Sequence, residues 1–142
     1  MARLLPFVLL AALAAVAVGL AAWTPGDKET GAAHVAVEVT GPDGVLFQGT
    51  VEAGSPTALG ALRAAAEAAG LAVETRAYSG LGSGCRGVYV EQVGPYRAEG
   101  SAGWVYEVRD AGQDAWRRPM HSAACEGLDH GNAVRWLWTD GA

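Results

Sequence analysis

The chain has 142 residues, of which 51% are hydrophobic and 18% are charged, and its formal net charge is −5. This composition fits one small folded domain and excludes both a fully disordered chain and a large enzyme fold. The negative charge argues against nucleic acid as a partner, because binding phosphates requires a basic face. Glycine contributes 20 residues, about twice its average share, which favours many turns over long helices.

An apolar stretch opens the chain. Arg3 precedes uncharged, apolar sequence from Leu4 to Trp23. A basic start, an apolar middle and small residues before a cleavage point are typical of a secretory signal peptide, whereas a membrane anchor needs about 20 apolar residues. The sequence therefore predicts that residues 1–23 are a signal peptide or an uncleaved N-terminal membrane anchor. Either one exports the rest of the chain, so we expect an extracytoplasmic protein, secreted or held at the cell surface by its membrane anchor.

A hairpin is predicted at the start of the folded domain. Residues 24–33 are polar and contain Pro and Gly, which indicates a linker, so the domain is expected to cover residues 34–142. Residues 34–40 and 45–51 alternate apolar and polar side chains, as strands with one buried face do. The sequence Gly-Pro-Asp-Gly at 41–44 is a strong turn signal and is expected to join these two strands.

One helix is expected after the hairpin. Ser55 suits an N-cap and Pro56 suits the first helical position. Apolar residues then recur at helical spacing, and Gly70 is expected to end the helix. The apolar positions are Leu59, Leu62, Ala66 and Ala69.

The rest of the chain alternates predicted strands with turns. The strands are expected at residues 71–78, 88–93, 103–109 and 133–139. Between them lie a glycine-rich loop at 79–87, a connection at 94–100 and an irregular segment at 110–132. This order of elements predicts an α+β domain in which one helix packs on a mostly antiparallel sheet.

Cys85 and Cys125 are the two cysteines of the chain. In an exported protein such a pair is expected to form a disulfide. A metal site is the rival interpretation, because His121 and His130 flank Cys125, and two Cys with two His make a zinc ligand set. The spacing matches no strong zinc pattern, so the sequence favours the disulfide and predicts no metal. Free thiols are the third alternative.

Aromatic residues gather in the last third of the chain. Two predicted strands each carry a pair of them on one face, and we expect these four to build the core against the helix. They are Trp104 and Tyr106 on one strand and Trp136 and Trp138 on the other. The alternative is that one or two of the aromatic residues line a ligand groove.

A ligand site is expected on the loops. Ligand sites often use aromatic walls, and Tyr96 and Trp116 lie in predicted loops, with Trp116 in a polar segment. The glycines of the 79–87 loop, Gly82 and Gly84 among them, would let a ligand approach the backbone closely. These four residues are therefore the predicted ligand contacts, in a groove at the end of the sheet bounded by the Gly80–Gly84 loop and the Pro95–Gly103 connection.

Patterns typical of catalysis are weak. The glycine run at 80–84 lacks the Lys-Ser/Thr of a phosphate-binding loop, and no nucleophile-elbow pattern G-x-S-x-G occurs. Paired carboxylates do not converge in the sequence either. We therefore expect a protein that is not an enzyme and that has no cofactor.

Three separated segments resemble a known family. GWVYEV at 103–108 is similar to a family strand that begins Gly-Trp-aromatic-Tyr, and GLDHGNAVRWLWT at 127–139 is similar to its closing strand. The helix segment at 55–70 resembles a Thr-x-x-x-Ala-Leu stretch. In this order the segments resemble the transcobalamin-like C-terminal domain of bacterial exported proteins of unknown function. Asn132 stands where that family usually has Asp, and Trp138 where Tyr is common.

The resemblance implies a β-grasp-like fold with a helix across the sheet. It also implies a ligand, because animal carrier proteins of this family use such a domain as one wall of a cobalamin site. We therefore expect a non-catalytic, exported or membrane-tethered binding module for a small molecule such as a corrinoid, or for another surface protein. The alternatives are a structural spacer or protein-interaction domain that binds no small molecule, and a small Cys/His metalloprotein.

Overall fold

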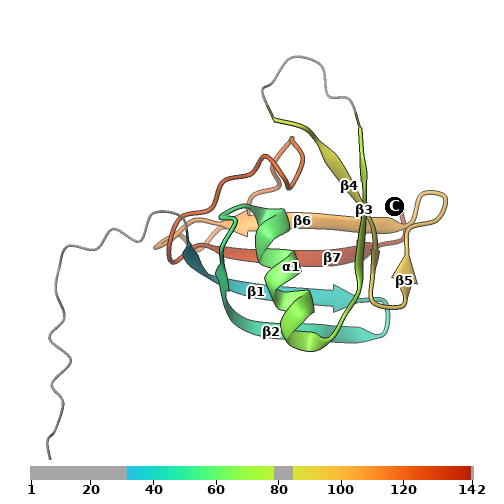
Figure 1. Cartoon of the computed structure of the whole chain (residues 1–142), viewed down its shortest axis with the longest axis horizontal. Helices are drawn as coiled ribbons and strands as arrows, with labels where there is room; N and C mark the ends of the chain where they lie inside the picture. The colour runs from blue at the N-terminus through green and yellow to red at the C-terminus, as the bar shows by residue number, and fades with distance from the viewer. Residues whose placement is uncertain (1–31, 79–84, 142) are drawn as a thin grey trace, which may run out of the picture.

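A computed structural model describes residues 32–78 and 85–141 (Figure 1). The described residues form an α+β domain, as predicted, but with two sheets instead of one. The elements are β1 (Ala33–Gly41), β2 (Gly44–Ala53), α1 (Ala58–Ala69), β3 (Val73–Ala77), β4 (Val88–Val93), β5 (Tyr96–Arg97), β6 (Gly103–Arg109) and β7 (Ala133–Thr139). The predicted signal peptide or anchor lies outside the described residues. Within the described part of the chain, none of the helical structure is long and apolar enough to cross a bilayer.

The predicted hairpin is confirmed. β1 and β2 pair antiparallel from Ala33 opposite Ala53 to Gly41 opposite Gly44. The alternation in β1 buries its valines, of which Val35 and Val37 are almost fully covered. The apolar face of the hairpin therefore forms the first part of the core.

The larger sheet is mixed, with strand order β2-β1-β7-β6. Its two central strands, β1 and β7, run parallel, while the pairs β1–β2 and β6–β7 are antiparallel. The helix lies across one face of this sheet (Figure 1). A mostly antiparallel sheet with this strand order is the β-grasp-like arrangement that the resemblance implies.

The helix begins two residues later than predicted. Its N-cap is Thr57, not Ser55, because Thr57 has extended backbone and its Oγ1 accepts a hydrogen bond from the N–H of Gly60 at 3.0 Å. Gly70 ends the helix as predicted, with left-handed backbone at φ 68°. The buried face of α1 consists largely of small side chains, so the helix can lie close to the sheet. The buried residues are Ala58, Leu59, Ala61, Leu62, Ala65 and Ala66.

The smaller sheet, of order β3-β4-β5, lies beside α1 on the same face of the main sheet (Figure 1). Its apolar residues, Val88 and Val90 among them, pack against the core. The strands predicted at 71–78 and 88–93 are β3 and β4. The two-residue strand β5 forms within the connection that the sequence predicted as a loop.

The four aromatic residues predicted for the core share one face of the main sheet. Trp104 stands opposite Trp138, and Tyr106 stands opposite Trp136, across the β6–β7 pair. Tyr106 and Trp136 are buried with stacked rings 5.2 Å apart, whereas Trp104 and Trp138 are half-buried with rings 5.5 Å apart. The inner pair belongs to the core, and the outer pair extends this aromatic row along the sheet.

Candidate functional site

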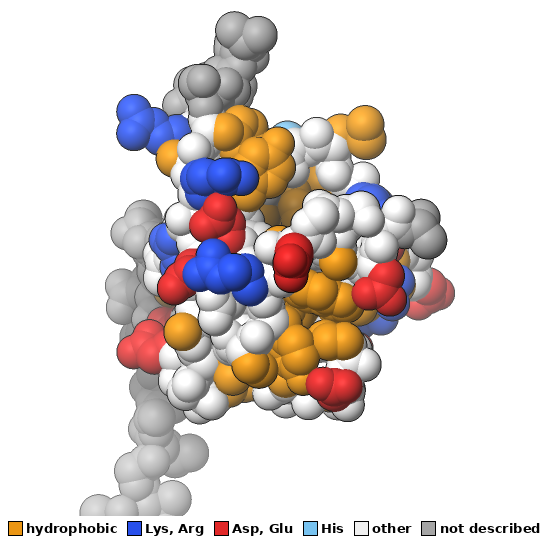
Figure 2. Space-filling view, turned by 90° about the vertical axis from the view of Figure 1, so that its right-hand side faces the viewer, with side chains coloured by type: hydrophobic (Ala, Val, Ile, Leu, Met, Phe, Trp, Pro, Cys, Tyr) orange, Lys and Arg blue, Asp and Glu red, His pale blue; other side chains and the backbone are white. Residues whose placement is uncertain are grey.

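A groove of about 350 Å³ opens between β4, β6 and the segment 118–123. Its floor is aromatic and comes from the main sheet. We call it the aromatic groove, and its lining residues are Tyr78, Val88, Tyr89, Val90, Trp104, Val105, Tyr106, Arg118, Pro119, Met120, His121, Ser122, Ala123 and Trp136. Figure 2 shows hydrophobic side chains gathered around a hollow near the top of the face it presents.

Two of the most exposed large hydrophobic side chains line this groove. Met120 is 98% exposed and Tyr89 is 57% exposed. The ring of Tyr89 lies against that of Tyr78, with 4.4 Å between their centroids. A cluster of exposed apolar side chains around a hollow is typical of an interaction site.

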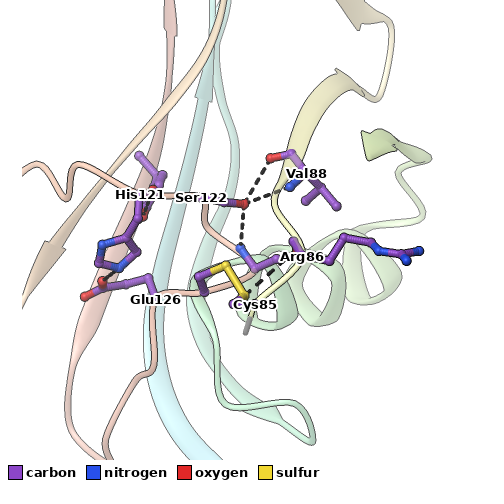
Figure 3. Close-up of a disulfide and its surroundings, with 9 residues drawn as sticks. Cys85, Arg86, Val88, His121, Ser122 and Glu126 are labelled. Carbon is purple, nitrogen blue, oxygen red and sulfur yellow. Dashed lines mark hydrogen bonds and ion pairs between the residues drawn. A yellow bond between two sulfur atoms is a disulfide. The ribbon is translucent and has the colours of Figure 1, made fainter. Parts of the chain in front are cut away.

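The predicted disulfide between Cys85 and Cys125 is confirmed, with 5.8 Å between the two Cα atoms (Figure 3). The disulfide links the residues just before β4 to the residues just after segment 118–123, which forms another wall of the groove. The bond engages both sulfur atoms, so neither is a free thiol. In the described ranges, no three His, Cys, Asp or Glu side chains are grouped so that they could hold a metal ion.

Ser122 adds a second link between the two walls. Its Oγ accepts a hydrogen bond from the N–H of Val88 at 2.9 Å and donates one to the carbonyl of Val88 at 3.1 Å. It also accepts a bond from the N–H of Ala124 at 3.3 Å. Figure 3 shows that Ser122 and His121 point to opposite sides of their segment. The serine hydroxyl is therefore engaged with backbone and does not form a nucleophile–base pair with the histidine.

A buried carboxylate organises the same segment from the other side. Glu126 is 5% exposed, contacts the imidazole of His121 and forms an ion pair with Arg117 at 2.6 Å. Arg117 also binds Asp110 at 3.1 Å, and its hydrogen bond lowers the pKa of that carboxyl. The hydroxyl of Tyr106 donates to the carbonyl of His121 at 2.7 Å. Burial, and next the charge of Glu126, raise the pKa of Tyr106, so the phenol stays neutral in this site.

The remaining charges around the groove are paired as well. Arg118 binds Glu107 at 3.1 Å, and Arg135 binds the same carboxylate. Burial alone would raise the pKa of Glu107, but the hydrogen bonds and charges of these two arginines outweigh it and lower that pKa. The charged side chain of Arg118 at the groove wall is therefore paired, and most of the other lining residues are apolar or aromatic.

Tyr96 and Trp116, the two predicted ligand contacts that lie in the described residues, are held in different parts of the domain and do not meet in one groove. Tyr96 lies in β5, where its hydroxyl donates to Asp43 at 2.8 Å, and this hydrogen bond raises its pKa. Trp116 is half-buried rather than exposed. It lies over the guanidinium groups of Arg135 and Arg109, at 4.3 and 4.9 Å, on the sheet face opposite the helix. Gly82 and Gly84 lie outside the described residues.

Sequence reasoning missed most of the groove. Tyr78 and Tyr89 flank the glycine-rich loop, and Met120 lies in the segment predicted to be irregular. The signal that could have located them was the cysteine pair. A bridge from Cys85 to Cys125 places the start of β4 against residues 118–125, which are two of the groove's walls.

No family model matches this chain, and no curated protein sequence matches it. Function is therefore inferred from the residues and geometry of the chain itself.

Proposed function

We propose that this chain is a non-catalytic, extracytoplasmic binding module, exported or tethered by its N-terminal segment, whose ligand occupies the aromatic groove. The observation that carries the proposal is the groove itself. Its floor is aromatic, with Tyr106 and Trp136 buried and Trp104 half-buried, and Met120 and Tyr89 are exposed on its rim. Its volume of about 350 Å³ lies at the small end of the range for ligand sites, which is about 300–1,000 Å³.

The groove is held open before any ligand arrives. The disulfide and the two hydrogen bonds between Ser122 and Val88 fix its walls to each other. A preformed site loses less conformational entropy on binding, which favours affinity. A disulfide also supports export, because such bonds persist in oxidising compartments.

The polar side chains that line the groove favour binding over catalysis. His121 is paired with Glu126, and Arg118 is paired with Glu107. The hydroxyl of Ser122 is bonded to backbone, so a nucleophile and a base do not meet there.

A corrinoid is the first ligand to test. We propose that the chain is a transcobalamin-like C-terminal domain, and the two resembling strand motifs lie side by side as β6 and β7. Each motif contributes one tryptophan to the groove floor, Trp104 and Trp136. An aromatic wall suits the flat face of a ring system. A groove of this size would cover one face or one edge of a corrin ring and leave the rest exposed.

Equilibrium dialysis of the full chain against cobalamin and against cobinamide tests this function. Met120→Glu places a charge on the groove rim, and Val45→Glu is a matched control because Val45 is 56% exposed and lies outside the groove. We expect saturable one-to-one binding that weakens at least about tenfold in Met120→Glu and is unchanged in Val45→Glu. Absence of binding to both corrinoids would overturn the corrinoid assignment. Equal binding by all three proteins would contradict the groove as the site.

A protein-interaction domain without a small-molecule ligand is the second candidate. The exposure of Met120 favours it, because methionine is enriched at protein interfaces and adapts to many partners.

A further inference from the structure

The aromatic groove runs along an open strand edge. β6 is the last strand of the main sheet, so one of its edges pairs with β7 and the other is outermost. On that outer edge Val108 exchanges two hydrogen bonds with Arg117, both 2.9 Å long. In an antiparallel pair the N–H and C=O of alternate residues point to the same edge. Tyr106 and Trp104 therefore present their backbone groups to the same edge as Val108, and no described residue hydrogen-bonds them there.

β4, on the other side of the groove from β6, presents a second open strand edge. The backbone groups of Val88 point away from β3, since both bond to Ser122. By the same alternation, the N–H and C=O of Val90 point away from β3 as well. The groove lining includes consecutive residues of both strands, 88–90 and 104–106. Consecutive residues lie on opposite faces of a strand, so the groove reaches the edges of these strands as well as the face that carries its aromatic floor.

A segment of the chain itself pairs with the outer edge of β6 over a short distance. Arg117 pairs with Val108 as an antiparallel strand would, and continuing that register would place Pro119 opposite Tyr106. Proline has no N–H to donate to the Tyr106 carbonyl, so the pairing cannot continue. Strand pairing therefore begins at this edge and stops at the point where the groove opens.

We propose that an extended peptide segment of a partner protein, uncharged and with apolar side chains at alternate positions, adds to the β6 edge at Trp104 and Tyr106. This inference rests on the proposed function, whose groove the peptide would occupy. Main-chain hydrogen bonds supply affinity in strand addition, and pockets for alternate side chains supply specificity. Alternate side chains of the added strand would lie on the face that carries Trp104 and Tyr106, beside Tyr89 and Met120.

Charge at the groove favours a neutral partner. Apart from its tyrosines, the ionisable residues of the lining are Arg118 and His121, and both are already paired with carboxylates of the chain. A charged peptide would lose hydration without gaining an unpaired counter-charge from these walls.

Fluorescence anisotropy of the full chain with labelled peptides tests the proposal. The probes are neutral octapeptides in which valine, leucine or tyrosine alternates with threonine. Each has a matched version that is N-methylated at alternate backbone nitrogens, in either of the two frames. We expect at least one sequence to bind saturably. We also expect one frame of methylation to weaken binding about tenfold or more, because it removes the donors to β6, and the other frame to weaken it less.

Met120→Glu and its control Val45→Glu separate this inference from the proposed function on which it rests. Peptide binding should weaken about tenfold or more in Met120→Glu and be unchanged in Val45→Glu. Absence of binding across the panel, or equal binding of both methylation frames, would overturn strand addition. If a corrinoid still binds in a manner that Met120→Glu weakens, the groove function stands and only the peptide inference fails. If neither class of ligand responds to Met120→Glu, both fail.

Discussion

The hydroxyl of Ser122 pairs with the backbone of Val88 as a neighbouring strand would, since it accepts from the N–H at 2.9 Å and donates to the carbonyl at 3.1 Å. The two residues are 34 positions apart in the chain. This one side chain therefore closes the end of the open β4 edge and joins the two walls of the aromatic groove.

Ser122→Ala is expected to destabilise the domain by about 1–3 kcal/mol, because it leaves the backbone groups of Val88 without partners in a part-buried site. Urea unfolding measures the effect. Ser101→Ala is the matched control, since Ser101 is exposed and its hydroxyl donates a long hydrogen bond, of 3.4 Å, to the Asp140 carbonyl. The control should change stability by less than about 0.5 kcal/mol. Equal unfolding free energies for the two variants would show that the Ser122–Val88 pair adds no stability.

Removing the disulfide should lower the free energy of unfolding by more than Ser122→Ala does. Replacing both cysteines, Cys85→Ala with Cys125→Ala, releases a constraint on residues 40 apart in sequence, worth about 3–4 kcal/mol in the chain-entropy model. The measurement is the midpoint of thermal unfolding under oxidising conditions. Wild type in excess reductant should fall to the midpoint of the double variant. An unchanged midpoint in the variant would contradict a bridge that constrains the unfolded chain.

Acid should weaken the fold partly through Glu107. Because Arg135 and Arg118 hold its folded pKa below the ordinary value of 4.5, its contribution to stability is complete above that value and is lost as the pH falls through the folded pKa. Unfolding midpoints from about pH 7 to about pH 3 should therefore decline less steeply in Glu107→Gln than in wild type. Glu67→Gln, on the exposed side of α1, should keep the wild-type decline. Parallel curves for wild type and Glu107→Gln would refute the assignment.

Amide hydrogen exchange tests the open edge of β6 without any ligand. Val105 and Glu107 direct their backbone groups toward β7, whereas Trp104 and Tyr106 direct theirs toward the groove. The amides of Trp104 and Tyr106 should therefore exchange faster than those of Val105 and Glu107, which serve as internal controls. Uniform protection along the four residues would mean that the edge is already covered.

The fold was predictable wherever the signal was local. The turn at 41–44, the alternation in the strands and the left-handed Gly70 each depend on a few neighbouring residues. The parallel pairing of β1 with β7 was not predictable in this way, because these strands are about a hundred residues apart in sequence. The N-cap is Thr57 and not the predicted Ser55. Both residue types suit that position, and only the backbone conformation distinguishes them.

The site was harder to predict than the fold. Tyr96 and Trp116 were chosen because they lie in predicted loops, but a loop residue can be engaged by neighbours that sequence does not reveal. The hydroxyl of Tyr96 binds Asp43, 53 residues away, and Trp116 lies over arginines from two different strands. The aromatic groove joins three segments that are separate in sequence, and only the cysteine pair indicated that two of them meet.

The most direct test of the central claim is a nuclear magnetic resonance titration of the isotope-labelled full chain with cobinamide and with the octapeptide panel. If a ligand occupies the aromatic groove, the backbone amide shifts that it causes should cluster at residues 88–90, 104–106 and 118–123. Shifts that cluster instead around Trp116 or Tyr96, or that are absent with every probe, would contradict the aromatic groove as the binding site.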